Sequence, residues 1–377
     1  MKIIIIGGGI GGLATALALH RQGVAAKVYE RADELHEVGA GISLWSNATH
    51  VLQQLGLLEE AIKSSAPVFQ IHIQNPAGQT LNVAHVDQYE PIMLGIHRAD
   101  LLTLLQRDIP TEQIYLNHTF DRFEPVGDKV RAQFTNGAVD ECDVLIGADG
   151  LKSRARQQII GDGEPIYCGY PVWRGLSDFP LNDELRGRPS ETLGAGYRFG
   201  IFPIGKGRIY WYATANFPAG QAEPPKGHKQ QLLSIFQAWH APIGELIAAT
   251  DEAAILRNDC YDRKPTRGWS QGQAILLGDA AHPTTPNMGQ GGCMALEDAL
   301  VLSKLLRANP TDLPATFKQF EQLRFSRTAK ITRLSRMFGA IGQWDSKFGV
   351  SWRELMFKLT PARLMDAQLK SVYEYQA

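Results

Sequence analysis

The N-terminal stretch KIIIIGGGIGGLATALALHRQG places a short apolar run directly before a glycine-rich turn and a helical pattern. Ile3 to Ile6 fit a buried strand, and apolar residues from Leu13 onward recur with helical spacing. Gly7, Gly9 and Gly12 occupy the G-x-G-x-x-G positions between the two elements. In such a turn the first glycine permits the bend, the second lets the backbone approach a pyrophosphate, and the third allows close helix packing. The chain is therefore predicted to begin with a dinucleotide-binding βαβ unit.

A carboxylate follows at the position that such a unit requires. The segment AAKVYERA reads as a second strand ending at Glu30, about 20 residues after the glycines. A carboxylate there can accept hydrogen bonds from a ribose diol, while the helix N-terminus supplies N–H groups and positive potential for phosphates. This combination favours an adenosine nucleotide with a free 2′-OH and leaves FAD and NAD both open.

Two later turns distinguish between these nucleotides. Asp149-Gly150 and Gly278-Asp279 each directly follow an apolar strand, and a simple NAD dehydrogenase has no need of the second turn. Asp279 is placed to hold a polyol such as a ribityl chain, although it could also cap the following segment. The run Gly289, Gln290, Gly291 and Gly292 then opens a long helix, whose dipole would stabilise negative charge on a reduced flavin.

The patterns between these motifs predict an α/β fold in which two domains are interleaved. Segments rich in aromatic and β-branched residues, such as YRFGIFPIGKGRIYWYATANF, read as an antiparallel sheet that carries the substrate. Residues 43–64 read as helical. The predicted units are a Rossmann-like FAD-binding domain of residues 1–68, 95–165 and 265–330, a β-sheet substrate domain of residues 69–94 and 166–264, and C-terminal helices of residues 331–377.

Bulk properties exclude several classes of protein. The 38 Lys+Arg and 39 Asp+Glu residues are spread without blocks, which argues against nucleic-acid binding. The four cysteines form no C-x-x-C pair, so no metal site is predicted, and reduced thiols fit a cytoplasmic protein. The N-terminal apolar run is too short for a signal peptide or a spanning helix. We expect a monomer or homodimer without integral membrane association. The amphipathic C-terminal helices could form a membrane or partner surface, but a core-facing stripe that covers the FAD domain is the expected role.

Three segments together resemble the single-component aromatic-ring hydroxylases, the family of 4-hydroxybenzoate hydroxylase. They are the GGGIGG start with Glu30, GADGLKSRAR at 147–156 and GDAAHPTTPNMGQGGCMALEDA at 278–299. Their order and spacing match across nearly the whole chain. The segments VGAGISLWSNA at 38–48 and GYRFGIFPIGKGRIYWYA at 196–213 are similar to the branch of urate hydroxylase, 3-hydroxybenzoate 6-hydroxylase and zeaxanthin epoxidase.

The resemblance implies non-covalent FAD, NAD(P)H as co-substrate, and O2-dependent hydroxylation of a small aromatic or heteroaromatic substrate through a flavin C4a-hydroperoxide. Most of the difficult chemistry then belongs to the cofactor, and the protein supplies orientation and water exclusion. The residues that the resemblance places at the cofactor are Gly7, Gly9, Ile10, Gly11, Gly12, Glu30, Arg31, Ser43, Arg98, Asp149, Asp279, Pro286, Gly289, Gln290, Gly291 and Gly292.

For the substrate, the resemblance points to Arg198 and Tyr210, whose equivalents in urate hydroxylase act on the substrate. Either could help a phenolic or enolic substrate lose its proton, but a surface arginine and a core tyrosine remain an open alternative. Pro286 would line the same site. Arg174 stands where urate hydroxylase has an Asn, which disfavours urate and favours an anionic substrate if Arg174 faces the cavity; a position facing solvent or a subunit contact is equally open.

Two residues near the third motif have a catalytic and a structural interpretation. His282 could act as a general base, but it is expected to serve its loop; Cys293 lies at the start of the flavin-facing helix, where its pKa could fall, but packing is the expected role. The alternatives to hydroxylation are epoxidation, N-oxygenation of an amine, and a non-catalytic binding protein of the GDP-dissociation-inhibitor kind.

Overall fold

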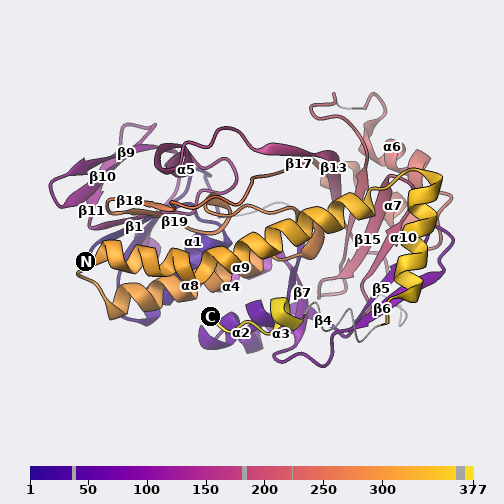
Figure 1. Ribbon diagram of the computed structural model, residues 1–377, viewed down its shortest axis with the longest axis horizontal. Helices are drawn as coiled ribbons and strands as arrows, with labels where there is room; N and C mark the ends of the chain where they lie inside the picture. Colours follow the sequence, from indigo (N-terminus) through magenta and orange to yellow (C-terminus); the bar gives the residue numbers. More distant parts are fainter. Residues whose placement is uncertain (36–39, 181–184, 223, 362–369) are drawn as a thin grey trace.

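A computed structural model describes residues 1–35, 40–180, 185–222, 224–361 and 370–377. Two large sheets occupy opposite halves of an elongated molecule, and one long helix, α9 (Leu313–Gly342), runs along both halves (Figure 1). The chain passes between the halves several times, so each sheet is assembled from segments far apart in sequence. The predicted α/β class with interleaved sheets is confirmed. No helix within these described ranges is long and apolar enough to cross a bilayer.

The first half is built on a six-stranded sheet. In spatial order its strands are β18 (Ser270–Gln271), β19 (Ala274–Leu276), β12 (Val144–Gly147), β1 (Ile3–Ile6), β2 (Ala26–Tyr29) and β8 (Ile114–Tyr115). All neighbours pair in parallel except β18 and β19. Because the chain leaves β1 towards β2 on one side and later returns to β12 on the other, the sheet has a topological switch point between β1 and β12. Ligands of such sheets bind there, beyond the carboxyl ends of the strands.

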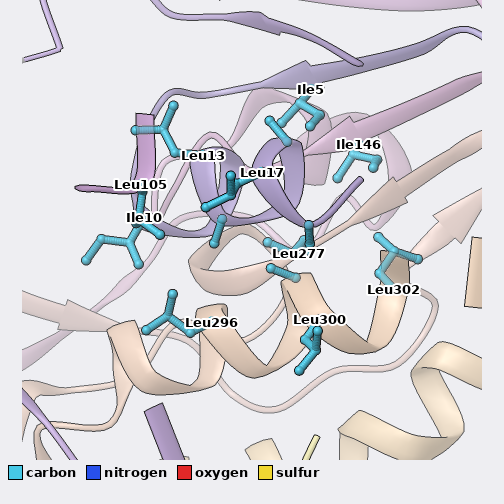
Figure 2. Close-up of a cluster of buried hydrophobic side chains, with 14 of the residues drawn as sticks. Ile5, Ile10, Leu13, Leu17, Leu105, Ile146, Leu277, Leu296, Leu300 and Leu302 are labelled. Carbon is cyan, nitrogen blue, oxygen red and sulfur yellow. The ribbon is translucent and has the colours of Figure 1, made fainter. Parts of the chain in front are cut away.

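Helices α1 (Ile10–Arg21) and α8 (Gly291–Ala308) pack together against this sheet. The apolar strands are buried on both faces, as expected of parallel strands between helices. Figure 2 shows the side chains that fill this layer. The labelled members of the cluster are Ile5, Ile10, Leu13, Leu17, Leu105, Ile146, Leu277, Leu296, Leu300 and Leu302. The packing brings the N-termini of both helices to the same edge of the sheet.

The second half is a seven-stranded sheet. Its strands are β17 (Leu256–Asp262), β13 (Ile166–Ser177), β16 (Ile209–Ala215), β15 (Tyr197–Pro203), β14 (Ser190–Leu193), β5 (Gln70–Gln74) and β6 (Thr80–His85). One face is covered by α6 (Gly227–Phe236) and α7 (Ile243–Ala249), over a core that includes Trp173, Phe199 and Trp211. The predicted antiparallel sheet is present, with one parallel pair inside it. β14 and β5 pair in parallel, because they meet from segments separated by a long crossover.

The remaining elements lie around the two large sheets. They are a sheet of β11 (Val139–Cys142), β10 (Lys129–Phe134) and β9 (Phe120–Val126), a sheet of β3 (Gly41–Leu44), β7 (Met93–His97) and β4 (Ser65–Val68), the helices α2 (Ser46–Gln54), α3 (Leu58–Ser64), α4 (Arg98–Gln106), α5 (Arg154–Ile159) and α10 (Lys347–Leu359), and the 3-10 turns Thr111–Gln113, Glu252–Ala254, Gly278–Ala280 and Pro286–Met288.

Two sequence-based boundaries differ from the structure. The predicted helical stretch 43–64 begins within β3, and it is interrupted around Gly56, whose φ of 67° ends α2. The boundary proposed between residues 330 and 331 falls inside α9, so a division there would cut a continuous helix. The hydrophobic pattern of α9 continues through residue 330 because both halves pack against it.

A buried ionic cluster joins α8 to its surroundings. Glu297 and Asp298 lie on α8 with no exposed side-chain surface. Arg324 of α9, equally buried, binds both: its Nη2 lies 2.6 Å from Glu297 Oε2, and its Nε lies 2.6 Å from Asp298 Oδ1. Asp298 Oδ2 also accepts hydrogen bonds from the Gly278 N–H at 3.0 Å and the His282 ring at 2.5 Å. These contacts with His282 and Arg324 hold the pKa of Asp298 at about 2 although burial alone would raise it.

We predict that Arg324→Ala destabilises the protein by about 3–5 kcal/mol, since it removes the arginine that binds the buried Asp298 and one of the two arginines that bind the buried Glu297. Chemical denaturation of the flavin-free protein measures this difference. Arg333→Ala on the exposed side of α9 is the matched control and should change the free energy of unfolding by less than about 0.5 kcal/mol. Equal effects of the two substitutions would contradict a stabilising role for the cluster.

Candidate functional site

A cavity of about 310 Å³, partly open to solvent, lies at the carboxyl ends of the six-stranded sheet. It is bounded by the turns after β1, β2, β12 and β19 and by the N-termini of α1 and α8. The predicted cofactor residues that line it are Gly7, Gly9, Ile10, Gly11, Glu30, Arg31, Arg98, Asp149, Asp279, Gly291 and Gly292. The fold therefore brings residues from all three motifs to one elongated space.

The glycines of the first turn show which of them faces a ligand. A Cβ at Gly7, where φ is 105°, would lie 2.4 Å from the Ala148 oxygen, and one at Gly12 would lie 1.9 Å from the Gly7 oxygen. These two positions are closed by neighbouring backbone. A Cβ at Gly9 would meet no atom within 4 Å, because Gly9 borders the cavity. The arrangement fits a pyrophosphate approaching Gly9 at the N-terminus of α1.

Glu30 is held at the edge of this cavity by its own turn. Its Oε2 accepts a hydrogen bond from the Gly8 N–H at 2.6 Å, and its Oε1 accepts one from the Ala32 N–H at 3.0 Å. A carboxylate can accept about four hydrogen bonds, so acceptor capacity remains for a ligand. The two backbone donors fix the carboxylate where a ribose diol could reach it.

Asp279 projects into the cavity from the 3-10 turn Gly278–Ala280. Its side chain is exposed, and within the described residues its carboxylate has no protein hydrogen-bond partner. A Cβ at Gly291 would lie 3.7 Å from Asp279 Oδ1, so the carboxylate lies beside the start of α8. Surrounding protein raises the pKa of Asp279, and His282 and Arg98 oppose that shift. An unpartnered carboxylate aimed into the cavity suits a polyol hydroxyl.

Asp149 has a structural role beside the one at the cavity. Its Oδ1 accepts a hydrogen bond from Ser153 Oγ at 2.5 Å, and its Oδ2 accepts from the Arg154 N–H at 2.8 Å. These bonds fix the turn between β12 and α5. Burial raises the pKa of Asp149, and the same hydrogen bonds oppose the shift.

Five predicted cofactor residues do not line the cavity: Gly12, Ser43, Pro286, Gly289 and Gln290. Gln290 is fully buried, and its Oε1 accepts a hydrogen bond from Asn47 Nδ2 at 3.0 Å. Gly289 adopts a left-handed conformation with φ of 61°, close to Ser43 and Trp45. Pro286 begins the preceding turn and is exposed. These residues shape the loop before α8. Val38 and Gly39, in the segment 38–48 on which the resemblance partly rests, lie outside the described residues.

Several lining residues were missed by sequence reasoning. Between β8 and the first residue of β9 they are His118, Thr119 and Phe120, and between β12 and the first residue of α5 they are Lys152 and Arg154. β8 has only two residues, too few for a recognisable alternation, so its position beside β2 had no sequence signal. Lys152 and Arg154 were visible within GADGLKSRAR, and their positive charge suits a phosphate-bearing ligand.

His282 and Cys293 take structural positions. His282 is buried and its Nε2 lies 2.5 Å from Asp298 Oδ2, so it ties the Gly278–Ala280 turn to α8. Burial raises the pKa of the Cys293 thiol to about 12. The suggestion that the start of α8 lowers this pKa was therefore wrong, because desolvation outweighs the helix dipole at a fully buried sulfur.

Arg174 and Tyr210 share the face of the seven-stranded sheet opposite α6 and α7. Arg174 pairs with Tyr212 across β13 and β16, and Tyr210 lies two residues away on the same face. Both side chains are half-buried although their strands lie inside the sheet. A Cβ at Gly41 would lie 2.5 Å from the Tyr210 ring, and Gly41 precedes Ile42, which lines the cofactor cavity. Tyr210 therefore stands at the border between sheet and cavity.

Arg198 is buried in a hydrogen-bond network. Its Nε donates to Gln343 Oε1 at 2.9 Å, Nη1 to Glu191 Oε1 at 3.2 Å, and Nη2 to Asn287 Oδ1 at 2.7 Å. Asn287 belongs to the turn before α8 and also donates to the Tyr170 hydroxyl at 3.0 Å. Arg198 is therefore not a surface residue, and its guanidinium already has protein hydrogen-bond partners. It connects the sheet to the loop beside the cavity.

The polyol assignment of Asp279 generates a binding prediction. Replacing Asp279 with Ala should weaken FAD binding by roughly 10- to 150-fold, as expected when a charge-assisted hydrogen bond of about 1.5–3 kcal/mol is lost. Flavin absorbance of the purified protein and titration of the flavin-free form measure the effect. The exposed Asp87→Ala is the control and should retain full flavin. Full flavin occupancy in the Asp279 variant would refute the assignment.

Comparisons with known proteins support the assignment of this cavity to FAD. A family model described as FAD binding domain matches residues 1–332. The aurachin C monooxygenase/isomerase of Stigmatella aurantiaca is 39% identical over 374 residues, which cover 98% of this chain and 97% of that protein. The chloroplastic zeaxanthin epoxidase of Solanum lycopersicum is 34% identical over 398 residues, which cover 97% of this chain but 58% of the epoxidase.

A solved structure extends the agreement to three dimensions. Klebsiella pneumoniae HpxO complexed with FAD and uric acid matches with a TM-score of 0.91 at 29% identity, covering 99% of this chain and 96% of that one. The family match, the relatives and the cavity lined by the three motifs all indicate the same class. The chain therefore belongs to the FAD-binding domain family, and within that family it is an FAD-dependent monooxygenase.

Proposed function

We propose that the protein hydroxylates a small, planar aromatic or heteroaromatic compound that carries an anionic or acidic group, with NAD(P)H and O2 as co-substrates. The observation that carries this proposal is the placement of Arg174 and Tyr210 on one half-buried sheet face next to the cofactor cavity. HpxO, which binds uric acid, supports a planar ring as the substrate class. Bound FAD supplies the activation of O2, while the residues of this chain bind and orient the substrate.

Arg174 is assigned to the anionic group. Its Nη1 donates to Asn258 Oδ1 at 3.1 Å, which uses one of five N–H groups and steadies the guanidinium at the sheet face. A guanidinium stays protonated at any physiological pH and pairs with carboxylates in a two-pronged geometry. Arg174 therefore favours a carboxylate, phenolate or enolate over a neutral ring.

Tyr210 is assigned to the substrate oxygen as a hydrogen-bond donor. Burial raises the pKa of its phenol, and the neighbouring Arg174 guanidinium only partly opposes that shift. Tyr210 therefore remains protonated near neutral pH and does not act as a base. Its O–H can stabilise the phenolate or enolate form of the substrate, which makes the ring more nucleophilic at the carbon that receives oxygen.

Arg198 is assigned mainly to positioning. Three of its five N–H groups already bind protein acceptors, and one of these acceptors, Asn287, belongs to the loop that precedes α8. Arg198 thereby sets the distance between the substrate sheet and that loop. Two N–H groups remain for a substrate. Pro286, exposed one residue before Asn287, is assigned to the boundary of the same site.

The relatives also support a second reaction on the same scaffold. Zeaxanthin epoxidase shares 34% identity with this chain, so epoxidation is the alternative outcome of oxygen transfer. N-oxygenation of an amine is a further variant. The four cysteines are free thiols, which supports a reducing, cytoplasmic location, and we propose a monomer or homodimer.

A substrate screen tests the proposed class. Phenols, hydroxybenzoates, purines and hydroxypyridines should differ in how strongly they accelerate NAD(P)H oxidation by the FAD-loaded protein, and acidic members should be the strongest. Mass spectrometry of products formed under 18O2 should show one labelled hydroxyl on a ring carbon. A labelled epoxide or N-oxide would contradict hydroxylation and show epoxidation or N-oxygenation instead. A protein that is colourless and takes up no FAD would return the chain to a non-catalytic binding role.

The role of Arg174 generates a further prediction. Arg174→Ala should raise KM for an anionic substrate by roughly 10- to 150-fold, because a hydrogen bond to a charged group contributes about 1.5–3 kcal/mol. The flavin content should stay unchanged. Steady-state kinetics against the acid and its neutral amide measure the effect, and the amide should be little affected. Arg122→Ala on the exposed part of β9 is the control. A similar loss for acid and amide would contradict the assignment.

A further inference from the structure

Helix α10 exposes a continuous apolar stripe. Of the twelve large hydrophobic side chains that are exposed in the described chain, five belong to this 13-residue helix: Phe348, Trp352, Leu355, Met356 and Leu359. Their spacing of four, seven, eight and eleven residues from the first places them on one side of the helix. Phe348 is 80% exposed and Leu359 is 69% exposed, so the part of the chain that the structure describes covers little of the stripe.

The opposite side of α10 is firmly attached to the substrate sheet. Arg353 is fully buried, with Nη2 donating to the Gly194 oxygen and Nη1 to the Gly342 oxygen, each at 2.7 Å. Asn82 Nδ2 of β6 donates to the Phe357 oxygen at 2.7 Å. These contacts fix the rotation of α10 and hold the stripe towards solvent, at the end of the molecule far from the six-stranded sheet (Figure 1). Of the two interpretations of the C-terminal helices, the expected core-facing stripe does not describe these five side chains of α10, which are exposed.

The exposed charged side chains of α10 are both lysines. Lys347 and Lys358 are exposed and lie along one border of it, together with Ser351. The acidic residue of the helix, Glu354, is half-buried and lies beyond the lysines, and Asp345 precedes the helix, where its Oδ2 accepts from Asn216 Nδ2 at 3.3 Å. Aromatic and leucine side chains bordered by lysines match an anionic lipid surface.

The size of the stripe argues against a second copy of the chain as its partner. A 13-residue helix is about 20 Å long, and a stripe about 10 Å wide along it offers on the order of 200 Å² per copy. A stable dimer buries roughly 800 Å² per partner. A bilayer interface needs no such area from a single helix, because the apolar side chains enter the headgroup region individually by about 5–10 Å.

We propose that α10 is an interfacial docking helix through which the protein binds reversibly to anionic phospholipid bilayers. This inference goes beyond the proposed function and does not depend on the identity of the substrate. The proposed docking surface is also close to the proposed substrate site. Gln343, in the turn between α9 and α10, accepts hydrogen bonds from Arg198 and Thr214 of the substrate sheet, so the docked surface lies next to that sheet.

Vesicle sedimentation with the FAD-loaded protein tests this proposal. The protein should pellet with vesicles of phosphatidylglycerol and phosphatidylcholine and much less with phosphatidylcholine alone. The double variant Phe348→Ser and Leu359→Ser should bind the mixed vesicles at least tenfold more weakly. Val139→Ser is the matched control, since Val139 is 63% exposed but lies on β11 in the other half, and it should bind as the parent does.

A second pair of variants tests the electrostatic part. Lys347→Gln with Lys358→Gln should reduce binding to the anionic vesicles only, and it should flatten the salt dependence of that binding. Flavin absorbance confirms that each variant is folded, and turnover is not the readout, so failure of the proposed function would leave this test intact. The proposal is overturned if the parent protein binds neither vesicle, or if the serine variant binds as the parent does. A dimer that dissociates in the serine variant would also overturn it and assign the stripe to a second copy.

Discussion

The structure depends on the placement of two carboxylates inside α8. Glu297 and Asp298 are wholly buried, which is tolerable only because Arg324 and the donors around them neutralise and hydrogen-bond both groups. Through them the N-terminal part of α8 is tied to the Gly278–Ala280 turn on one side and to α9 on the other. Asp279 follows Gly278 directly, so the orientation of the cofactor-facing carboxylate is set by a neighbour that never reaches the cavity.

Local sequence patterns predicted the parts of the site that are made locally. The β1–α1–β2 unit, with Gly9 open to the cavity and Glu30 at its edge, follows from adjacent residues whose conformations reinforce one another. Asp279 was recognisable because it stands in a glycine-acid turn just after a buried strand, followed by the glycine cluster that opens α8. These features depend on the chain direction and on glycine conformations, both of which can be read from a single segment.

Features set by distant contacts could not be predicted in the same way. The parallel pairing of β5 with β14 joins strands from separate crossings of the chain, and no local pattern encodes it. Arg198 was marked as a site residue only by the resemblance, and its network with Gln343 and Asn287 joins segments that are far apart in the sequence. The stripe on α10 has the spacing of a core-facing helix. Only the burial of Arg353 on its other side shows which way it turns.

Helix α9 has a consequence for how the reaction cycle can proceed. It is one uninterrupted rod of 30 residues, about 45 Å long, anchored near the cofactor by Arg324 and followed directly by Gln343 against the substrate sheet. A hinge motion that separates the two halves would have to break α9 or disrupt the buried ion pairs of Arg324 with Glu297 and Asp298. Access to the cofactor cavity therefore depends on small displacements of the loops that border it, within a frame of constant length.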